Sequence, residues 1–178
     1  DENGIAVYVN PNAVPMGFLQ TTCTGTHHQR MDSETVPTVM LAAVTLGDAD
    51  LAIYGERMQT LDVYDIPAWQ ESVARLKKNA CNGFDTTADG FIAHIDAKEA
   101  GMLVFTIPFD KGFSATIDGQ KTEIVNCDVA FMGVWVEPGE HEIVFTYRTR
   151  GLVLGLLMSV GAAIVLAAYV FTCRRRAM

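Results

Sequence analysis

The second half of the chain alternates apolar and polar residues with a period of two. Such alternation is typical of strands that have one buried and one solvated face, as in antiparallel sheets. Within residues 141–147, for example, Ile143, Phe145 and Tyr147 share one side. Strands are predicted at 91–97, 102–108, 113–118, 122–125, 130–137 and 141–147. Several short strands at this spacing predict an antiparallel β-sandwich or jelly roll.

Turn residues separate these strands at three places. Asp118-Gly119 predicts a tight hairpin, because both residue types tolerate the positive φ angles that such a turn requires. Two more turns are predicted at residues 110–112, which read DKG, and at residues 138–139, which read PG.

Helical spacing appears only before residue 91. An apolar stripe predicts a helix that begins near Pro37 and ends at Gly47-Asp48. Residues 66–80 predict a second, amphipathic helix, with Trp69 and Val73 on its apolar face.

Two further short strands are predicted at residues 5–9 and 16–19, where apolar residues precede or follow turn residues. The expected fold is therefore mainly β with some α. Residues 1–90 would form an α/β part and residues 91–148 an antiparallel sheet of the same domain.

The end of the chain has a different pattern. Residues 151–173 contain no charge, and at about 1.5 Å per residue they form roughly 34 Å of helix, enough to cross a ~30 Å hydrocarbon core. Three arginines follow at 174–176. Because positive charge beside a span stays inside the cell, residues 174–178 are predicted to be a cytoplasmic tail and the preceding domain to be extracytoplasmic. Arg148 and Arg150 flank the other end, so a domain on the cytoplasmic side remains an alternative.

Charge is distributed unevenly along the chain. All 21 acidic residues and 10 of the 13 basic residues precede the apolar segment, which leaves a net charge of −11 on the first 150 residues. Such a balance argues against nucleic acid or an anionic lipid surface as the partner of this domain.

The cysteines and nearby polar residues leave several possibilities open. Cys23, Cys81 and Cys127 precede the span, so at most one disulfide and a free thiol are expected. Cys23 with the histidine pair at 27–28 could hold a metal, although the surrounding sequence is typical of a polar loop. The acidic residues Asp48, Asp50 and Glu56 match no known ligand spacing, and we predict no metal site.

Four residues are candidates for substrate binding. Asp110 and Lys111 in the DKG turn could contact a substrate or simply fix the loop. Phe113 and Trp135, with Phe109 and Phe131, are aromatic residues that could stack on a sugar ring. The strand at 130–137 is apolar on both sides, however, which favours Trp135 as a core residue. No catalytic residue is predicted, because no nucleophile with its base is present.

The chain contains the blocks IPFDKGFSATIDGQK at 107–121, AFMGVWVEPGEHEIVFTYRTRG at 130–151 and NPNAVPMGF at 10–18. These three blocks resemble the bacterial YfhO family of polytopic membrane proteins. The resemblance covers nearly the whole chain and places it at the C-terminal end of such a protein, whose last membrane helix would be residues 151–173.

The resemblance implies a membrane glycosyltransferase of the GT-C type. Such enzymes use lipid-linked sugars, and this family is implicated in glycosylating cell-envelope polymers such as lipoteichoic acid. Their catalytic carboxylate lies on an early loop upstream of this region, so the domain would be non-catalytic by itself. It would hold no cofactor, although the parent enzyme could use a divalent cation. We expect the bilayer and upstream helices of the parent chain as partners, with a lipid-linked sugar or glycan as ligand.

A second hypothesis is a cell-surface module that binds a glycan or a protein and is anchored by one membrane helix. No initiator methionine and no signal peptide precede Ile5, so the chain is expected to be the tail of a longer polytopic protein. Many hydrophobic segments upstream would favour the first hypothesis, and a signal peptide just upstream would favour the second.

Overall fold

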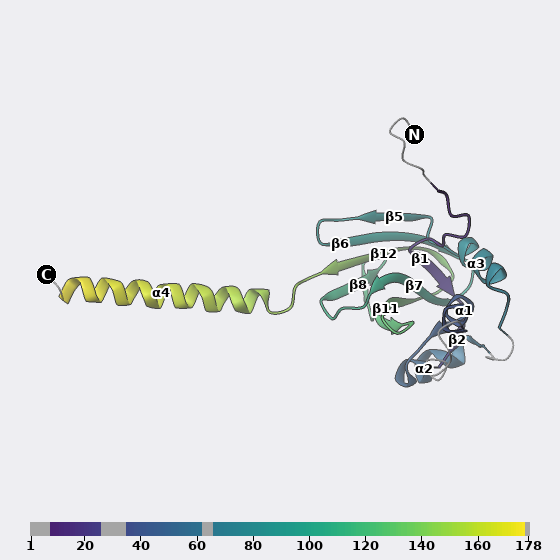
Figure 1. The fold of residues 1–178 in the computed structure, drawn as a ribbon, viewed down its shortest axis with the longest axis horizontal. Helices are drawn as coiled ribbons and strands as arrows, with labels where there is room; N and C mark the ends of the chain where they lie inside the picture. The colour runs from purple at the N-terminus through teal and green to yellow at the C-terminus, as the bar shows by residue number, and fades with distance from the viewer. Residues whose placement is uncertain (1–7, 26–34, 62–65, 177–178) are drawn as a thin grey trace, which may run out of the picture.

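The computed structural model describes residues 8–25, 35–61 and 66–176. Two antiparallel sheets pack face to face, a small layer of helices and short strands covers the outer face of one sheet, and one long helix leaves the domain (Figure 1). The predicted fold class, a mainly β sandwich with some α, is confirmed.

Nine strands build the sandwich. The four-stranded sheet has the order β1 (Gly17–Gln20), β7 (Gly101–Pro108), β11 (Phe131–Val136) and β10 (Val125–Cys127). The five-stranded sheet has the order β5 (Gly83–Thr86), β6 (Gly90–Ala97), β12 (Gly139–Tyr147), β8 (Phe113–Ile117) and β9 (Gln120–Thr122).

Two of the three predicted turns join different sheets. Residues 109–112 lead from β7 to β8, and residues 137–138 lead from β11 to β12, each across the sandwich. Asp118 and Gly119 do form a hairpin between β8 and β9, with φ angles of 51° and 78°.

The prediction of a single strand at residues 122–125 is wrong. Thr122 ends β9 in one sheet, and Val125 begins β10 in the other. Stacked sheets lie about 10 Å apart, so the two residues between these strands are used to cross that distance.

The small layer contains α1 (Thr35–Ala42), α2 (Asp48–Tyr54), a short 3-10 turn η2 (Gly55–Arg57) and α3 (Trp69–Lys78). It also contains a parallel sheet in the order β3 (Val44–Thr45), β2 (Thr22–Thr24) and β4 (Gln59–Thr60). The described residues of this layer therefore form three short α-helices where two were predicted, and α2 had no prediction.

The helix predicted to reach Gly47 ends at Ala42. Val44 pairs with Cys23 in β3, and the Arg75 guanidinium donates hydrogen bonds to the carbonyl oxygens of Leu41, at 3.3 Å, and Ala42. These bonds satisfy carbonyl groups that the helix end leaves unpaired. The continuing apolar stripe therefore belongs to a buried strand.

The other predictions for the first 90 residues have mixed outcomes. The helix at 66–80 and the strand at 16–19 are confirmed as α3 and β1. In α3, Val73 is buried, but Trp69 is 41% exposed because it is the first residue of the helix. The strand predicted at 5–9 lies mostly outside the described residues, and its last two residues form no strand.

Two apolar clusters hold these layers together. One lies between the sheets and includes Phe91, Phe105 and Phe145. The other lies between the four-stranded sheet and the small layer. β11 contributes to both, with Met132 in the first and Trp135 at the edge of the second, which confirms that this strand is covered on both faces.

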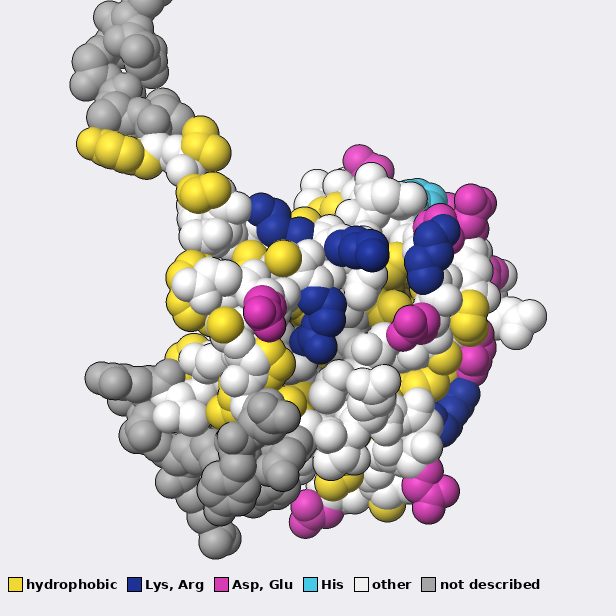
Figure 2. Space-filling model, turned by 90° about the vertical axis from the view of Figure 1, so that its right-hand side faces the viewer, with side chains coloured by type: hydrophobic (Ala, Val, Ile, Leu, Met, Phe, Trp, Pro, Cys, Tyr) yellow, Lys and Arg dark blue, Asp and Glu magenta, His cyan; other side chains and the backbone are white. Residues whose placement is uncertain are grey.

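The long helix α4 (Leu152–Arg176) follows β12 after four residues. Its segment Leu152–Arg175 has 24 residues and a mean hydropathy of 2.4, so it is long and apolar enough to cross a bilayer. The predicted helix at 151–173 is confirmed. Figure 2 looks at the opposite end of the domain, where basic and acidic side chains intermingle.

Candidate functional site

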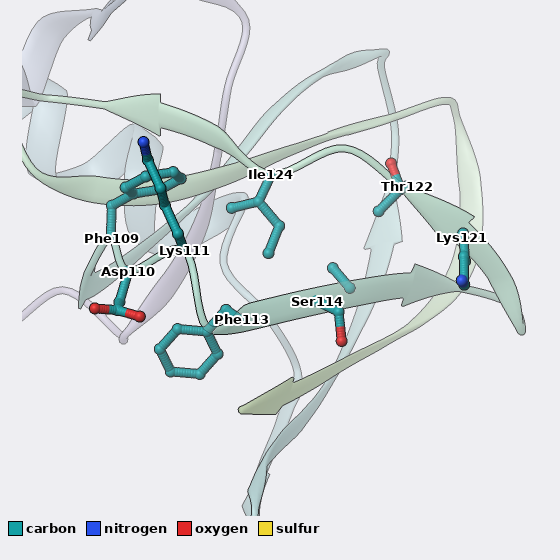
Figure 3. A pocket seen from close by; sticks show the side chains of 9 residues that line it. Phe109, Asp110, Lys111, Phe113, Ser114, Lys121, Thr122 and Ile124 are labelled. Atoms are coloured by element: carbon teal, nitrogen blue, oxygen red, sulfur yellow. The ribbon is translucent and has the colours of Figure 1, made fainter. Parts of the chain in front are cut away.

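A groove lies along the edge of the five-stranded sheet, between the β7–β8 connection and the β8–β9 hairpin (Figure 3). Its volume is about 360 Å³. It is lined by Phe109, Asp110, Lys111, Phe113, Ser114, Ala115, Lys121, Thr122 and Ile124. The structure thus brings together three of the four predicted binding residues, namely Asp110, Lys111 and Phe113.

Asp110 fixes the turn at one end of the groove. Its Oδ1 accepts a hydrogen bond from the Gly112 N–H at 2.6 Å, and its carbonyl oxygen accepts one from Phe113 N–H at 3.1 Å. This is the usual way in which an aspartate stabilises a turn through its own side chain. Lys111 is left exposed at the tip of the turn.

Aromatic side chains form the apolar wall of the groove. The Phe113 ring lies 4.8 Å from that of Tyr147 and 6.3 Å from that of Phe145, which belongs to the core. Phe109 and Ile124 are partly buried against the same core. The wall is therefore a rigid extension of the sandwich interior.

The groove is attached to the segment that leads into α4. Arg148 N–H donates a hydrogen bond to the Gly112 carbonyl oxygen at 3.0 Å. A Cβ atom on Gly112 would lie 2.7 Å from the Arg148 carbonyl oxygen, so only glycine allows this close approach. α4 begins at Leu152, only four residues after Arg148.

Trp135 lies elsewhere, on the outer face of the four-stranded sheet. Its ring stacks on Tyr54 at 5.4 Å, and the Arg57 guanidinium lies 4.1 Å from the ring centroid. Its Nε1–H donates to Glu137 at 2.9 Å, and hydrogen bonds from Trp135 and then Arg57 lower the pKa of that carboxyl group. Trp135 therefore fastens the small layer to the sandwich, and it does not line the groove with Lys111.

Asp128 is a structural feature that sequence analysis missed. It is only 4% exposed, has a φ of 48° and lies between β10 and β11. Its Oδ1 accepts from Thr45 N–H at 2.8 Å, and its own N–H donates to the Thr45 carbonyl oxygen at 3.1 Å. Burial raises the pKa of Asp128 to about 7, opposed in part by its hydrogen bonds with Thr45. This residue links the sandwich to β3.

Thiols and possible metal ligands form no site in the part of the chain that the structure describes. Cys23 and Cys127 are buried, Cys81 is partly buried, and all three are unpaired. His27 and His28 lie outside the described residues, so their pairing with Cys23 stays untested. Among the described residues, no three histidine, cysteine or carboxylate side chains are placed to hold a metal ion.

A histidine links two turns at the end of the sandwich away from α4. His141 Nδ1 lies 2.7 Å from Asp118 Oδ2, and its Nε2 lies 3.0 Å from the Glu137 carbonyl oxygen. The hydrogen bond from the Glu142 backbone and then that with His141 lower the pKa of Asp118. Both contacts join the β8–β9 turn to the β11–β12 connection, so this histidine has a structural role.

The fold and the groove define a β-sandwich held close to a bilayer by a single C-terminal helix. Residues 44–159 match the family profile described as bacterial membrane protein YfhO. The chain therefore belongs to the YfhO family of bacterial membrane proteins. The match includes two of the blocks that carry the resemblance and leaves out the block at 10–18. No curated protein and no solved structure matches the chain.

Proposed function

We propose that this region is the extracytoplasmic C-terminal domain and last membrane helix of a glycosyltransferase that uses lipid-linked sugars. Its product would be a glycosylated cell-envelope polymer such as lipoteichoic acid. Membership of the YfhO family and the apolar helix α4 support this proposal. The arginines after α4 favour a cytoplasmic C-terminus and hence an extracytoplasmic domain.

The domain would position the acceptor without performing chemistry. The observation that carries this role is the hydrogen bond between Arg148 and Gly112, which holds the groove next to the start of α4. Asp110, the carboxylate of the groove, is already engaged by Gly112 N–H and is poorly placed as a general base. The catalytic carboxylate, and any divalent cation, would belong to the upstream part of the parent enzyme.

Charge reversal in the groove tests this role. In the full-length protein, Lys111→Glu with Lys121→Glu should lower envelope glycosylation about tenfold, because the groove would repel an anionic lipid carrier or polymer. The measurement is the sugar content of the purified polymer, normalised to the amount of membrane-inserted protein.

Lys77→Glu with Lys78→Glu supplies the matched control, because it makes the same double charge reversal on exposed α3, away from α4 (Figure 1). Equal activity in the groove variant and in this control would refute the positioning role. Binding of glycan without any effect on glycosylation would favour the alternative of a surface binding module.

Sidedness can be tested with an added thiol. The native cysteines are poor reporters, since Cys23 and Cys127 are fully buried. Glu99→Cys, in the exposed β6–β7 connection, should react with an impermeant maleimide in intact cells. Ala177→Cys, after the arginines, should react only after permeabilisation. The reverse pattern would place the domain in the cytoplasm.

A further inference from the structure

We propose that the groove binds the phosphate headgroup of an anionic lipid in the bilayer that α4 crosses. This contact would hold the sandwich against the membrane surface in a fixed orientation. It stands independently of sugar transfer, because it depends only on α4 and on the residues that line the groove.

One end of the groove lies close to the start of the membrane helix. Arg148 N–H is hydrogen-bonded to the Gly112 carbonyl oxygen, and α4 begins at Leu152, the fourth residue after Arg148. A fully extended chain covers at most about 3.5 Å per residue, so Arg148, to which the DKG turn is hydrogen-bonded, lies within about 14 Å of the apolar span. The polar headgroup layer is roughly 5–8 Å thick on each side of the hydrocarbon core. The Lys111 end of the groove therefore opens in or directly above that layer, and Lys121, which faces Thr116, lies three residues further along β8 from the membrane.

The lining of the groove combines positively charged and apolar side chains. Lys111 and Lys121 stand at opposite ends of the groove, with the apolar side chain of Phe109 beside Lys111 and that of Ile124 between the two lysines (Figure 3). An amphiphile with an anionic head fits this combination, because phosphate oxygens accept from ammonium groups while glycerol and the first methylenes cover apolar surface.

The positive charges of the groove are not neutralised by ion pairs. Within the described residues, neither Lys111 nor Lys121 forms a salt bridge. Asp110 binds its own turn. Glu123 lies towards α2, where burial and then its charge raise the pKa of Asp50. The domain as a whole is therefore negatively charged, whereas the exposed charges of the groove are mainly positive.

The segment between the groove and α4 favours a bilayer lipid as the occupant. Arg148 and Arg150 are exposed in this segment, which joins the groove to the first turn of α4. A headgroup bound there would remain attached to acyl chains that lie beside α4, so the contact is continuous with the membrane interface. Each basic residue at an anionic surface strengthens the attraction about fivefold.

The intact membrane protein in nanodiscs provides the test. Hydrogen–deuterium exchange of residues 109–124 would be compared in phosphatidylcholine discs and in discs that also contain phosphatidylglycerol. We expect exchange to slow at least fivefold in the anionic discs. Lys111→Gln with Lys121→Gln should abolish the slowing, while Lys77→Gln with Lys78→Gln, a matched change on α3, should keep it.

Three results would overturn the proposal. Equal exchange in both kinds of disc would show that no anionic headgroup binds. Equal loss of the slowing in the groove variant and in the double variant of Lys77 and Lys78 would show general attraction of charge. The same slowing from free glycerol phosphate added to phosphatidylcholine discs would identify a soluble phosphate as the occupant. Unchanged exchange in β6 and β12 serves as the check that each variant is folded.

Discussion

Gly90→Ala is expected to unfold the domain or to lower its free energy of unfolding by about 3–5 kcal/mol. A Cβ atom at this position would lie 1.9 Å from the Phe145 carbonyl oxygen and 3.1 Å from the Thr146 Cα. Both contacts are with backbone of β12, which pairs with β6 from Gly139 to Thr146. The clash can be relieved only by separating the two longest strands of the five-stranded sheet, because no side chain can move aside.

Gly119→Asn is the matched control for this prediction. Gly119 has a φ of 78° and no atom within 4 Å of the added Cβ, and asparagine tolerates that conformation. Its effect should stay within about 0.5 kcal/mol. Thermal unfolding of the detergent-solubilised protein, followed by circular dichroism, would compare the two variants. Similar midpoints would show that β6 and β12 approach each other differently from the structure.

Asp128→Asn is expected to stabilise the domain above pH 7. The pKa of Asp128 rises from 3.8 to about 7 on folding, mainly through burial. The folded protein thus keeps a proton that the unfolded chain releases as the pH rises from about 4 to 7. The stabilising contribution of the protonated form is complete below 3.8 and is lost over that interval, for a maximum of about 4 kcal/mol. Asparagine keeps the acceptor oxygen for Thr45 N–H without a charge.

Urea unfolding at pH 5 and pH 8 would measure this effect. The free energy of unfolding of Asp128→Asn should exceed that of the native protein by more at pH 8 than at pH 5. Taking the difference between the two proteins at each pH cancels the titration of the other carboxylates. Asp128→Ala serves as the contrast, because it removes the acceptor and strains a residue with a φ of 48°, so it should destabilise at both pH values. A gain from Asp128→Asn that is independent of pH would contradict the raised pKa.

The sequence predicted the strands of the sandwich better than the way in which they pair. Alternation in residues 141–147 located β12 correctly, since alternation depends only on one face being buried. Alternation does not tell which sheet a strand joins, so the crossings at 109–112 and 123–124 required the tertiary structure. The same limit explains α1, whose apolar stripe continued into β3 with no change in residue type.

The groove was partly predictable. The DKG turn directed attention to Asp110 and Lys111, which the structure places together with Phe113. Lys121 was missed, although the Asp118-Gly119 hairpin sets a register in which Lys121 faces Thr116. Trp135 was correctly favoured as a packed residue, but its partners Tyr54 and Arg57 come from α2 and η2. Nothing in the sequence near Asp128 indicated that it would bind β3.

The short connection between β12 and α4 has a mechanical consequence. Tyr147 and Arg148 are held by Phe113 and Gly112, and only residues 149–151 remain free to bend before the helix begins. Because this connection is so short, a force that neighbouring helices apply to α4 would be transmitted to the five-stranded sheet. A change in the tilt of α4 within the bilayer would therefore change the orientation of the sandwich relative to the membrane surface. Movements of the transmembrane part would in this way alter the position of the domain.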